Sequence, residues 1–310
     1  MALLLDPQLW RLTVATAAPL LLAALGELVA ERAGVLNVSI EGLMALGASV
    51  GFLAAFLGHD PWAGVIAAVV AGALVVQVLA YAAIRLRIDQ LSTGLALFVL
   101  CIGLASLCYR LAIGFRLVLP RVATLTPWPV PHLGSLPAAA KIILTQNALV
   151  YFALLLVPVA WAILFHTPRG LRIRSVGENP RAADAVGINV FALRWTCLTV
   201  AGSLAGLAGA YYPLAVTGAY HDGIIGGRGW IALMLVILGR WSPWRTLAGA
   251  MLFAFVEVLQ FKVALFVKNV PPQFLLMAPY VLAIVVLAVA YRGARGPAAL
   301  MRPYDREERG

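Results

Sequence analysis

Long apolar runs recur along the whole chain, and they limit its possible folds more than any other feature of the sequence. A helix of about 20 apolar residues crosses the roughly 30 Å hydrocarbon core of a bilayer. The runs cover residues 12–29, 40–57, 62–84, 91–109, 148–165, 195–214, 229–239, 246–266 and 273–291. Hydrophobic residues make up 63% of the chain, whereas soluble domains contain roughly 45–50%. The sequence therefore predicts one all-α polytopic membrane domain over residues 1–310, with about nine transmembrane helices.

The run at 229–239 is too short to cross a bilayer as one straight helix. The glycine-rich stretch HDGIIGG, residues 221–227, precedes it. Irregular backbone is tolerated at membrane depth only inside protein or beside a water-filled cavity. Two interpretations stay open: a broken helix that the glycine-rich stretch continues, or a re-entrant segment that neighbouring helices protect.

The net charge of +10 comes mostly from arginines that lie between the apolar runs. Cytoplasmic loops of membrane proteins carry an excess of Lys and Arg. A cytosolic C-terminus puts the arginine-rich stretch 168–194 and the tail 292–309 inside, in agreement with this bias. We therefore predict a multi-pass protein of the cell inner membrane that contacts lipid, and we expect no nucleic-acid partner.

A weak internal repeat relates the two parts of the chain at about 10–109 and 194–291. Arg194 lies 183 residues after Arg11, and Pro243 lies 182 residues after Pro61. Five predicted crossings separate the two prolines, and an odd number inverts the second copy, as in many transporters. The alternative is a chance match between spans that are rich in glycine and alanine.

Polar side chains at the starts of apolar runs, or within them, are candidates for a solute path. The candidates are Asn37, Ser39, Glu41, Gln90, Thr93, Asn147, Glu257 and Gln260. Amides and hydroxyls suit a neutral hydroxylated solute, because they replace its hydration without an unpaired charge. Any one of them can instead join neighbouring helices by hydrogen bonds. Glu257 is more costly in lipid, so it is expected to act in transport or to be paired, for example with Lys262.

The sequence offers no arrangement typical of an enzyme or a metal site. The four histidines lie in separate loops, the three cysteines lie inside apolar runs, and no G-x-x-x-x-G-K-[ST] nucleotide loop occurs. We therefore expect no catalytic residue, no metal and no cofactor. An ion-coupled secondary transporter is an alternative, since it would share the inverted repeat. It needs buried acids, and only Glu257 and Glu27 qualify.

The stretch 168–194 is the only long polar segment between two apolar runs in which a short, sharply bounded helix can be placed. Asn179 is a good N-cap, Pro180 fits the first helical position, and Gly187 suits the left-handed residue that ends a helix. This predicts a two-turn helix over 180–186 that presents small side chains to a partner outside the membrane. These side chains are Ala182, Ala183 and Val186. The alternative is an ordinary basic cytosolic loop.

Four segments, in this order along the chain, resemble the permease family of ABC importers for branched-chain amino acids, simple sugars and nucleosides. They are ERAGVLNVSIEG (31–42), DQLSTGLAL (89–97), GENPRAADAVGIN (177–189) and GRGWIALMLVILGRWSPW (227–244). The resemblance covers about residues 26–291 and is closest to the nucleoside and simple-sugar branch. It implies a pore-forming subunit that moves a nucleoside or a simple sugar across the inner membrane. A permease for branched-chain amino acids is the alternative.

The resemblance also implies partners. ATP would be hydrolysed in a separate cytosolic ATPase subunit, and a periplasmic or lipid-anchored binding protein would deliver the substrate. A second, homologous permease would complete the pore as a heterodimer. The wording ERAGVLNVSIEG and the lack of an additional N-terminal span resemble the shorter member of such a pair.

By the same resemblance, the central helix is the coupling helix that seats in the ATPase. The implied coupling residues are Glu178, Asn179, Pro180, Arg181, Ala182, Ala183, Val186 and Gly187. Two alanines and a glycine, at 182, 183 and 187, match the family's coupling motif. The leading glutamate of that motif is absent, and Arg181 stands in its place with Glu178 three residues earlier. The chain therefore departs from the motif at a polar contact to the ATPase.

Overall fold

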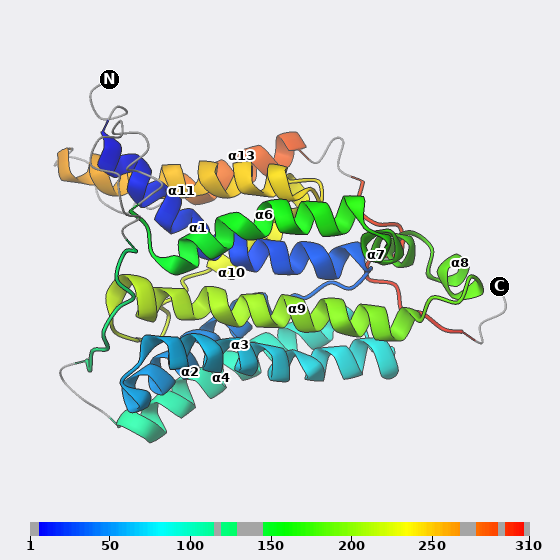
Figure 1. The fold of residues 1–310 in the computed structure, drawn as a ribbon, viewed down its shortest axis with the longest axis horizontal. Coiled ribbons are helices and arrows are strands. Elements are labelled where there is room, and N and C mark those ends of the chain that lie inside the picture. Colours follow the sequence, from blue (N-terminus) through cyan, green and yellow to red (C-terminus); the bar gives the residue numbers. More distant parts are fainter. Residues whose placement is uncertain (1–5, 115–118, 129–144, 267–276, 291–294, 307–310) are drawn as a thin grey trace.

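A computed structural model describes residues 6–114, 119–128, 145–266, 277–290 and 295–306. These residues form a helical bundle, as the apolar runs predict, with most helices roughly along one axis (Figure 1). The elements are α1 (Pro7–Arg32), α2 (Ile40–Gly58), α3 (Pro61–Ala80), η2 (Tyr81–Arg85), α4 (Gln90–Ile113), α6 (Ala148–His166), α7 (Pro168–Glu178), α8 (Pro180–Ala185), α9 (Val190–Tyr211), η3 (Tyr212–Thr217), α10 (Arg228–Leu238), α11 (Pro243–Phe266) and α13 (Ala278–Ala290).

Seven of the described helices are long and apolar enough to cross a membrane. They are α1, α2, α3 with the π-helical turn η2, α4, α6, α9 with the π-helical turn η3, and α11. In contrast, α10 has 11 residues and α13 has 13, fewer than a straight crossing requires. The described residues therefore do not confirm the expected count of about nine transmembrane helices.

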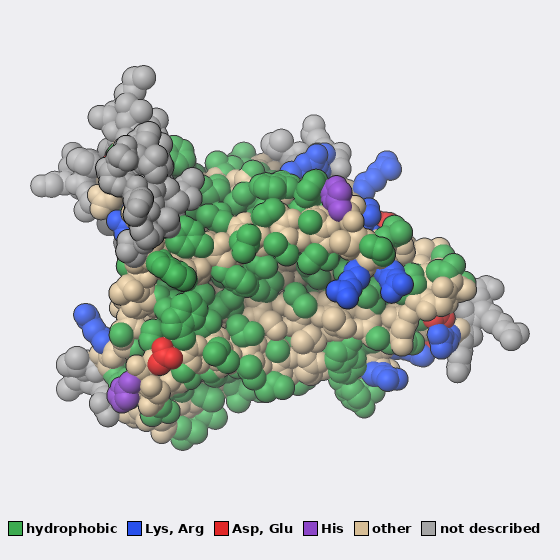
Figure 2. Space-filling model, in the orientation of Figure 1, with side chains coloured by type: hydrophobic (Ala, Val, Ile, Leu, Met, Phe, Trp, Pro, Cys, Tyr) green, Lys and Arg blue, Asp and Glu red, His purple; other side chains and the backbone are tan. Residues whose placement is uncertain are grey.

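The two ends of the bundle differ in charge. We call the end that carries α7, α8 and the tail 295–306 the basic end, and the other the opposite end. Lys and Arg side chains gather at the basic end, and hydrophobic side chains cover the middle of the visible face (Figure 2). An excess of positive charge at one end is the distribution that the positive-inside rule describes.

Helix α10 begins half-way through the bundle. It finishes at the basic end, where Arg32 donates two hydrogen bonds to the carbonyl oxygen of Trp241. Eleven residues extend only about 16 Å, so the first residue, Arg228, lies near mid-depth. The irregular residues 218–227 lead back to the opposite end, where Gly218 accepts a hydrogen bond from Val122 N–H. The short apolar run is therefore a broken helix that the glycine-rich stretch continues.

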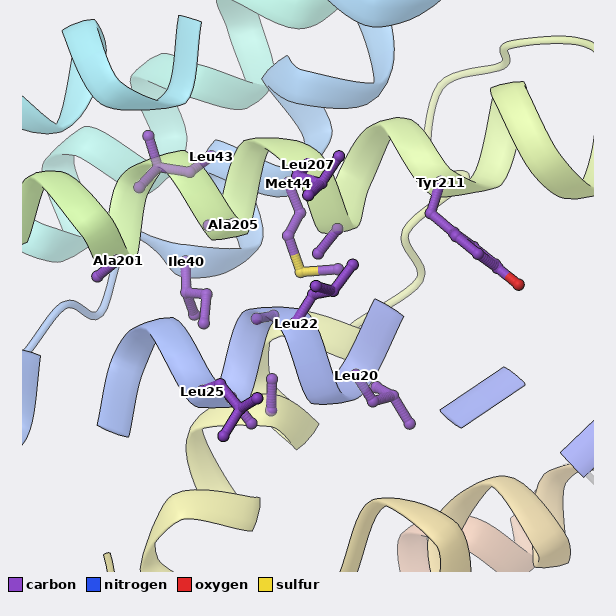
Figure 3. Close-up of a cluster of buried hydrophobic side chains, with 14 of the residues drawn as sticks. Leu20, Leu22, Leu25, Ile40, Leu43, Met44, Ala201, Ala205, Leu207 and Tyr211 are labelled. Atoms are coloured by element: carbon purple, nitrogen blue, oxygen red, sulfur yellow. The ribbon is translucent and has the colours of Figure 1, made fainter. Parts of the chain in front are cut away.

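Helix α1 is the central helix of the bundle. It packs against α9, α11, α10 and α6, and its residues 20–25 are completely or almost completely buried. Figure 3 shows Leu20, Leu22 and Leu25 of α1 beside Ile40, Leu43 and Met44 of α2 and beside Ala201, Ala205 and Leu207 of α9. A helix that is covered on all sides needs no polar face, which explains the nearly unbroken apolar sequence of α1.

Helix α9 approaches α2 so closely that no side chain fits at Gly209. A Cβ atom at this position would overlap the backbone of Met44. Small residues permit such close contacts between membrane helices. We expect Gly209→Val to push the two helices apart and to lower the free energy of unfolding by about 1–3 kcal/mol, the usual cost of overpacking. A lower Tm of the detergent-solubilised protein would show this.

Gly103 in α4 supplies the matched control, because a Cβ atom there meets no other atom within 4 Å. Gly103→Val should therefore leave the Tm almost unchanged. Equal Tm shifts in the two variants would contradict the close α2–α9 contact.

The helix directions support the proposed inverted repeat. Pro61 begins α3 at the opposite end, whereas its match Pro243 begins α11 at the basic end. Arg11 and Arg194 likewise lie in α1 and α9, which run in opposite directions along the bundle. The division into two halves stays a prediction, and these opposed directions agree with it.

Candidate functional site

The short helix α8 projects from the basic end of the bundle (Figure 1). Oδ1 of Asn179 accepts a hydrogen bond from Ala182 N–H at 3.0 Å, as an N-cap does. Gly187 has a φ of 86°, the left-handed conformation that closes a helix. Both predicted caps are therefore present, and the helix ends at Ala185, one residue before the predicted end.

The segment before α8 is also helical, which the sequence analysis did not predict. Helix α7 begins at Pro168, where Oγ1 of Thr167 accepts a hydrogen bond from Gly170 N–H at 3.2 Å. It lies across the bundle, and Figure 1 views it nearly end-on. Gly177 packs against the carbonyl oxygen of Arg32 so closely that a Cβ atom would overlap it. The Thr-Pro pair at 167–168 is the sequence feature that could have predicted this start.

Only part of α8 faces outward. Val186 is 76% exposed and Ala182 is exposed, but Ala183 is 3% exposed. Ala183 packs with Val176, Val190 and Tyr304 in a small cluster separate from the main core. The prediction that Ala183 faces a partner is therefore wrong. Consecutive helical residues point about 100° apart, so Ala182 and Ala183 cannot share one narrow face.

The C-terminal tail holds α8 against the bundle. Tyr304 belongs to the cluster around Ala183, and Arg306 donates two hydrogen bonds to the carboxylate of Asp184, at 2.8 and 2.6 Å. The backbone N–H of Ala299 donates to the carbonyl oxygen of Gly177 at 2.8 Å. The hydrogen bonds from Arg306 lower the pKa of Asp184 below its usual range, so this carboxylate is ionised at neutral pH.

Three predicted path residues are hydrogen-bonded in, or to, the link 33–39 between α1 and α2. Oδ1 of Asn37 accepts a hydrogen bond from the hydroxyl of Ser39 at 2.6 Å, and the N–H of Asn37 donates to Glu27 Oε1 at 2.8 Å. Oε1 of Gln90 accepts a hydrogen bond from Leu36 N–H at 2.9 Å. All of these polar side chains are buried. Gln90 and Glu27 thereby fix the link to α4 and α1, whereas the bond between Asn37 and Ser39 stays within the link.

Two further candidates are Thr93 in α4 and Gln260 in α11. The hydroxyl of Thr93 donates to the carbonyl oxygen of Asp89 at 2.8 Å, one turn earlier in the chain. Gln260 is buried in α11. Neither arrangement by itself indicates contact with a solute.

Glu41 caps the broken helix α10. Its Oε1 accepts a hydrogen bond from Gly227 N–H at 2.8 Å, and its Oε2 accepts one from Gly229 N–H at 2.6 Å. The first N–H groups of a helix have no partner within the helix, and at membrane depth they need one. Glu41 also lines a cavity of about 260 Å³ beside α4. It therefore stabilises the start of α10 and borders a candidate path.

Glu257 pairs with Arg228 and not with Lys262. Nη2 of Arg228 lies 2.5 Å from Oε1 of Glu257. The guanidinium of Arg228 also lies over the ring of Tyr212, 5.1 Å from its centroid. Lys262 instead forms an ion pair with Asp6 at the start of α1. The predicted pair is wrong because Arg228 begins a helix at mid-depth beside α11, within reach of Glu257.

A larger cavity of about 880 Å³ lies towards the opposite end, among α1, α6, η3 and α11. Its polar lining includes Gln146, Asn147, Tyr211, Arg228 and Glu257. The structure thus brings two predicted path residues, Asn147 and Glu257, to one cavity. It places Glu41 at the smaller cavity, which lies near the start of α10.

A comparison with protein families shows which family this chain belongs to. The family described as "Branched-chain amino acid transport system / permease component" matches residues 12–290. The chain belongs to this permease family. The permease is 37% identical to the guanosine ABC transporter permease NupQ of Bacillus subtilis, with 96% of each chain covered. It is 36% identical to the nucleoside ABC transporter permease NupC of Lactococcus lactis, with 91% of each chain covered.

A solved structure agrees at the level of the fold. A chain of an ABC transporter described as metal-chelate type, in an inward-facing conformation, superposes with a TM-score of 0.53 at 17% identity. The match covers 91% of this permease and 84% of that chain. The protein is therefore a permease subunit of an ABC transporter and a multi-pass protein of the cell membrane, and it is not itself an enzyme. Family membership implies an ATPase and a substrate-binding protein as partners.

Several residues that shape these sites of the permease were not among the candidates from the sequence. Arg194 is buried in α9 and donates hydrogen bonds to the carbonyl oxygens of Ala33 and Arg302. It thereby joins α1, α9 and the tail. Arg228, Tyr304 and Arg306 were likewise counted only as loop or tail residues. Nothing local in the sequence distinguishes these arginines from the other basic residues, because their partners lie far away along the chain.

Proposed function

We propose that the permease forms, with a second homologous permease, the pore of an importer for nucleosides. The likeness to a guanosine permease and to a nucleoside permease, over nearly the whole length of each, carries this proposal. A permease of Haloferax volcanii described as a glucose transporter component is 34% identical, with 95% of this chain covered. A simple sugar is therefore the second candidate substrate.

The basic end is the proposed docking surface for a separate cytosolic ATPase subunit. Asn179 and Gly187 cap α8 at both ends, and Arg306 ties it to the tail. A helix held in this way can transmit motion from an ATPase to α9 and α6, whereas a loose loop would absorb it. We assign the direct contact to the exposed residues Ala182 and Val186, together with Pro180 and Arg181.

Two residues of the coupling segment act from within the permease in this proposal. Ala183 positions α8 through the cluster with Val176, Val190 and Tyr304. Oε2 of Glu178 accepts a hydrogen bond from Ala298 N–H at 3.3 Å and so holds the tail. With the ATPase at the basic end, a periplasmic or lipid-anchored binding protein would deliver substrate at the opposite end.

The two cavities beside the start of α10 are the candidate routes for the solute. Asn147 and Glu257 line the larger cavity, and Glu41 lines the smaller one. Amide, hydroxyl and carboxylate groups can replace the hydration of a neutral, hydroxylated solute. The other candidates, namely Asn37, Ser39, Gln90, Thr93 and Gln260, are assigned to holding the helices that form these routes.

Uptake by the reconstituted complex tests the proposal. The permease would be purified with its ATPase and partner permease and placed in liposomes with the binding protein. Radiolabelled guanosine, uridine, ribose, glucose and leucine would be offered with and without internal ATP. We expect ATP-dependent uptake of nucleosides. Uptake of ribose or glucose alone would favour the second candidate, uptake of leucine alone would favour amino acids, and uptake driven by an ion gradient would indicate a secondary transporter.

A further inference from the structure

Three aromatic residues surround the start of the broken helix α10 on the side of α4 and α13. The ring of Trp230 meets the ring of Phe98 edge to face, with the ring centroids 5.4 Å apart. The hydroxyl of Tyr280 donates to the carbonyl oxygen of Gly226, one helical turn before Trp230. Trp230 is 37% exposed and Tyr280 is 51% exposed. We call Phe98, Trp230 and Tyr280 the aromatic shelf.

Lipid cannot cover this side of the bundle. The residues Asp222, Gly223 and Gly226 precede α10, are exposed, and have irregular backbone between mid-depth and the opposite end. Exposed irregular backbone in hydrocarbon would leave N–H and C=O groups unpaired, at a cost of several kcal/mol each. The face must therefore border water or another protein, and a pore between two permeases supplies both.

A polar track leads from this face to the opposite end. The carboxylate of Asp222 accepts hydrogen bonds from the hydroxyl of Ser106, at 3.1 Å, and from Arg110, at 3.2 Å. Ser106 and Arg110 lie one turn apart on α4. Asp222 and Ser106 also line the cavity of about 260 Å³, together with Glu41, Ile102, Tyr220 and Gly226. Phe98 lies one turn from Ile102 on the same helix, so the shelf lies next to this cavity.

The larger cavity on the other side of α10 differs in the state of its charged groups. Its two charged residues near the start of α10, Arg228 and Glu257, are already bound to each other. Asp222 is also paired, with Arg110, but its side chain is 51% exposed, whereas that of Glu257 is 12% exposed. The smaller cavity holds the carboxylates of Glu41 and Asp222. The half-exposed rings of Trp230 and Tyr280 lie beside it at the start of α10, near mid-depth, where transporters with inverted repeats and broken helices bind substrate.

We infer that the aromatic shelf, with Asp222 farther along the same face towards the opposite end, is the specificity-determining site of the permease for a planar heterocyclic base. The base stacks on Trp230, and the carboxylate of Asp222 accepts hydrogen bonds from N–H or hydroxyl groups of the solute. Every nucleobase has a flat face that stacks on an aromatic ring, whereas a free sugar has none. This inference rests on the proposed nucleoside substrate and adds the residues that distinguish a nucleoside from a sugar.

The test compares two replacements of Trp230 in the reconstituted complex. Trp230→Phe keeps an aromatic ring, whereas Trp230→Leu keeps an apolar side chain without one. We expect Trp230→Leu to raise the KM for guanosine uptake about 10-fold or more, the effect of losing one stacking contact. Trp230→Phe should stay within about 3-fold of wild type. The maximal ATP-driven rate and the recovery of the complex should be similar in all three proteins.

Trp244→Leu is the matched control, because Trp244 is 47% exposed but lies at the basic end of α11. It should leave the KM for guanosine unchanged. If wild type imports nucleosides and Trp230→Leu behaves like Trp244→Leu, the shelf is not the base site, although the proposed function stands. If wild type imports only a sugar, both are overturned. If Trp230→Leu fails to assemble, Tyr280→Ala removes another ring of the shelf instead: a raised KM for guanosine would support the inference, and an unchanged KM would overturn it.

Discussion

Replacing Ala182 by glutamate should abolish ATP-driven uptake and release the ATPase, while the permease stays folded in the membrane. Ala182 is exposed on α8, so the new side chain meets no group of its own chain that would unfold the helix. At a close contact with the ATPase it adds both volume and an unpaired charge, and each costs roughly 1–3 kcal/mol. Together these costs correspond to a loss of docking of at least about 10-fold. Co-purification of the ATPase with the tagged permease measures it.

The same substitution at Ala123 is the control, since Ala123 is exposed at the opposite end of the bundle. Ala123→Glu should retain the ATPase. Val186→Asp, on the outward side of α8, should behave like Ala182→Glu. In contrast, Ala183→Glu should also lower the Tm, because it places a carboxylate in the buried cluster. Normal ATPase recovery in both Ala182→Glu and Val186→Asp would show that α8 is not the docking helix.

Removing the partner of Arg228 should destabilise the permease more than any other single charge change among the described ion pairs. The side chains of Arg228 and Glu257 are only 25% and 12% exposed, and their ion pair joins α10 to α11. Glu257→Leu leaves a largely buried guanidinium without its carboxylate, at a cost of about 3 kcal/mol, the lower end of the range for buried pairs. The Tm in detergent should fall by several degrees, and the broken helix should become susceptible to proteolysis near Gly227.

A double replacement distinguishes the loss of the whole ion pair from the loss of one partner. The variant with both Arg228→Met and Glu257→Leu should recover most of the lost Tm, because neither charge is then left buried alone. Lys262→Met removes a charge from a more exposed pair, in which Asp6 is 37% exposed, and should cost less than about 1 kcal/mol. A Glu257→Leu variant as stable as wild type would mean that the pair does not hold α10.

The apolar runs predicted most of the bundle correctly, since seven of them form helices long enough to cross the membrane. The caps of α8 were also predictable, because Asn179 and Gly187 act on neighbours within three or four residues. α7 was missed although Thr167 and Pro168 mark its start, because its three arginines made a cytosolic loop the simpler interpretation.

The contacts of the polar residues could not be read from the sequence. Glu41 and its two N–H donors lie 186 and 188 residues apart, and Arg306 and Asp184 lie 122 residues apart. Glu257 was given the wrong partner because Lys262 is near in sequence, whereas Arg228 reaches it only through the packing of α10 on α11. Ala183 was placed outward because helical spacing does not say where the tail will lie.

Hydrophobicity and capping are local properties, so the sequence by itself determined the membrane class, the long helices and the ends of α8. Only the tertiary structure decided which face of α8 is outward, which acid pairs with Arg228, and that Glu41 closes the start of a broken helix. The physical reason is that a buried polar group takes its role from whichever donor or acceptor the fold brings within about 3 Å. That partner is set by helix packing between distant segments of the chain.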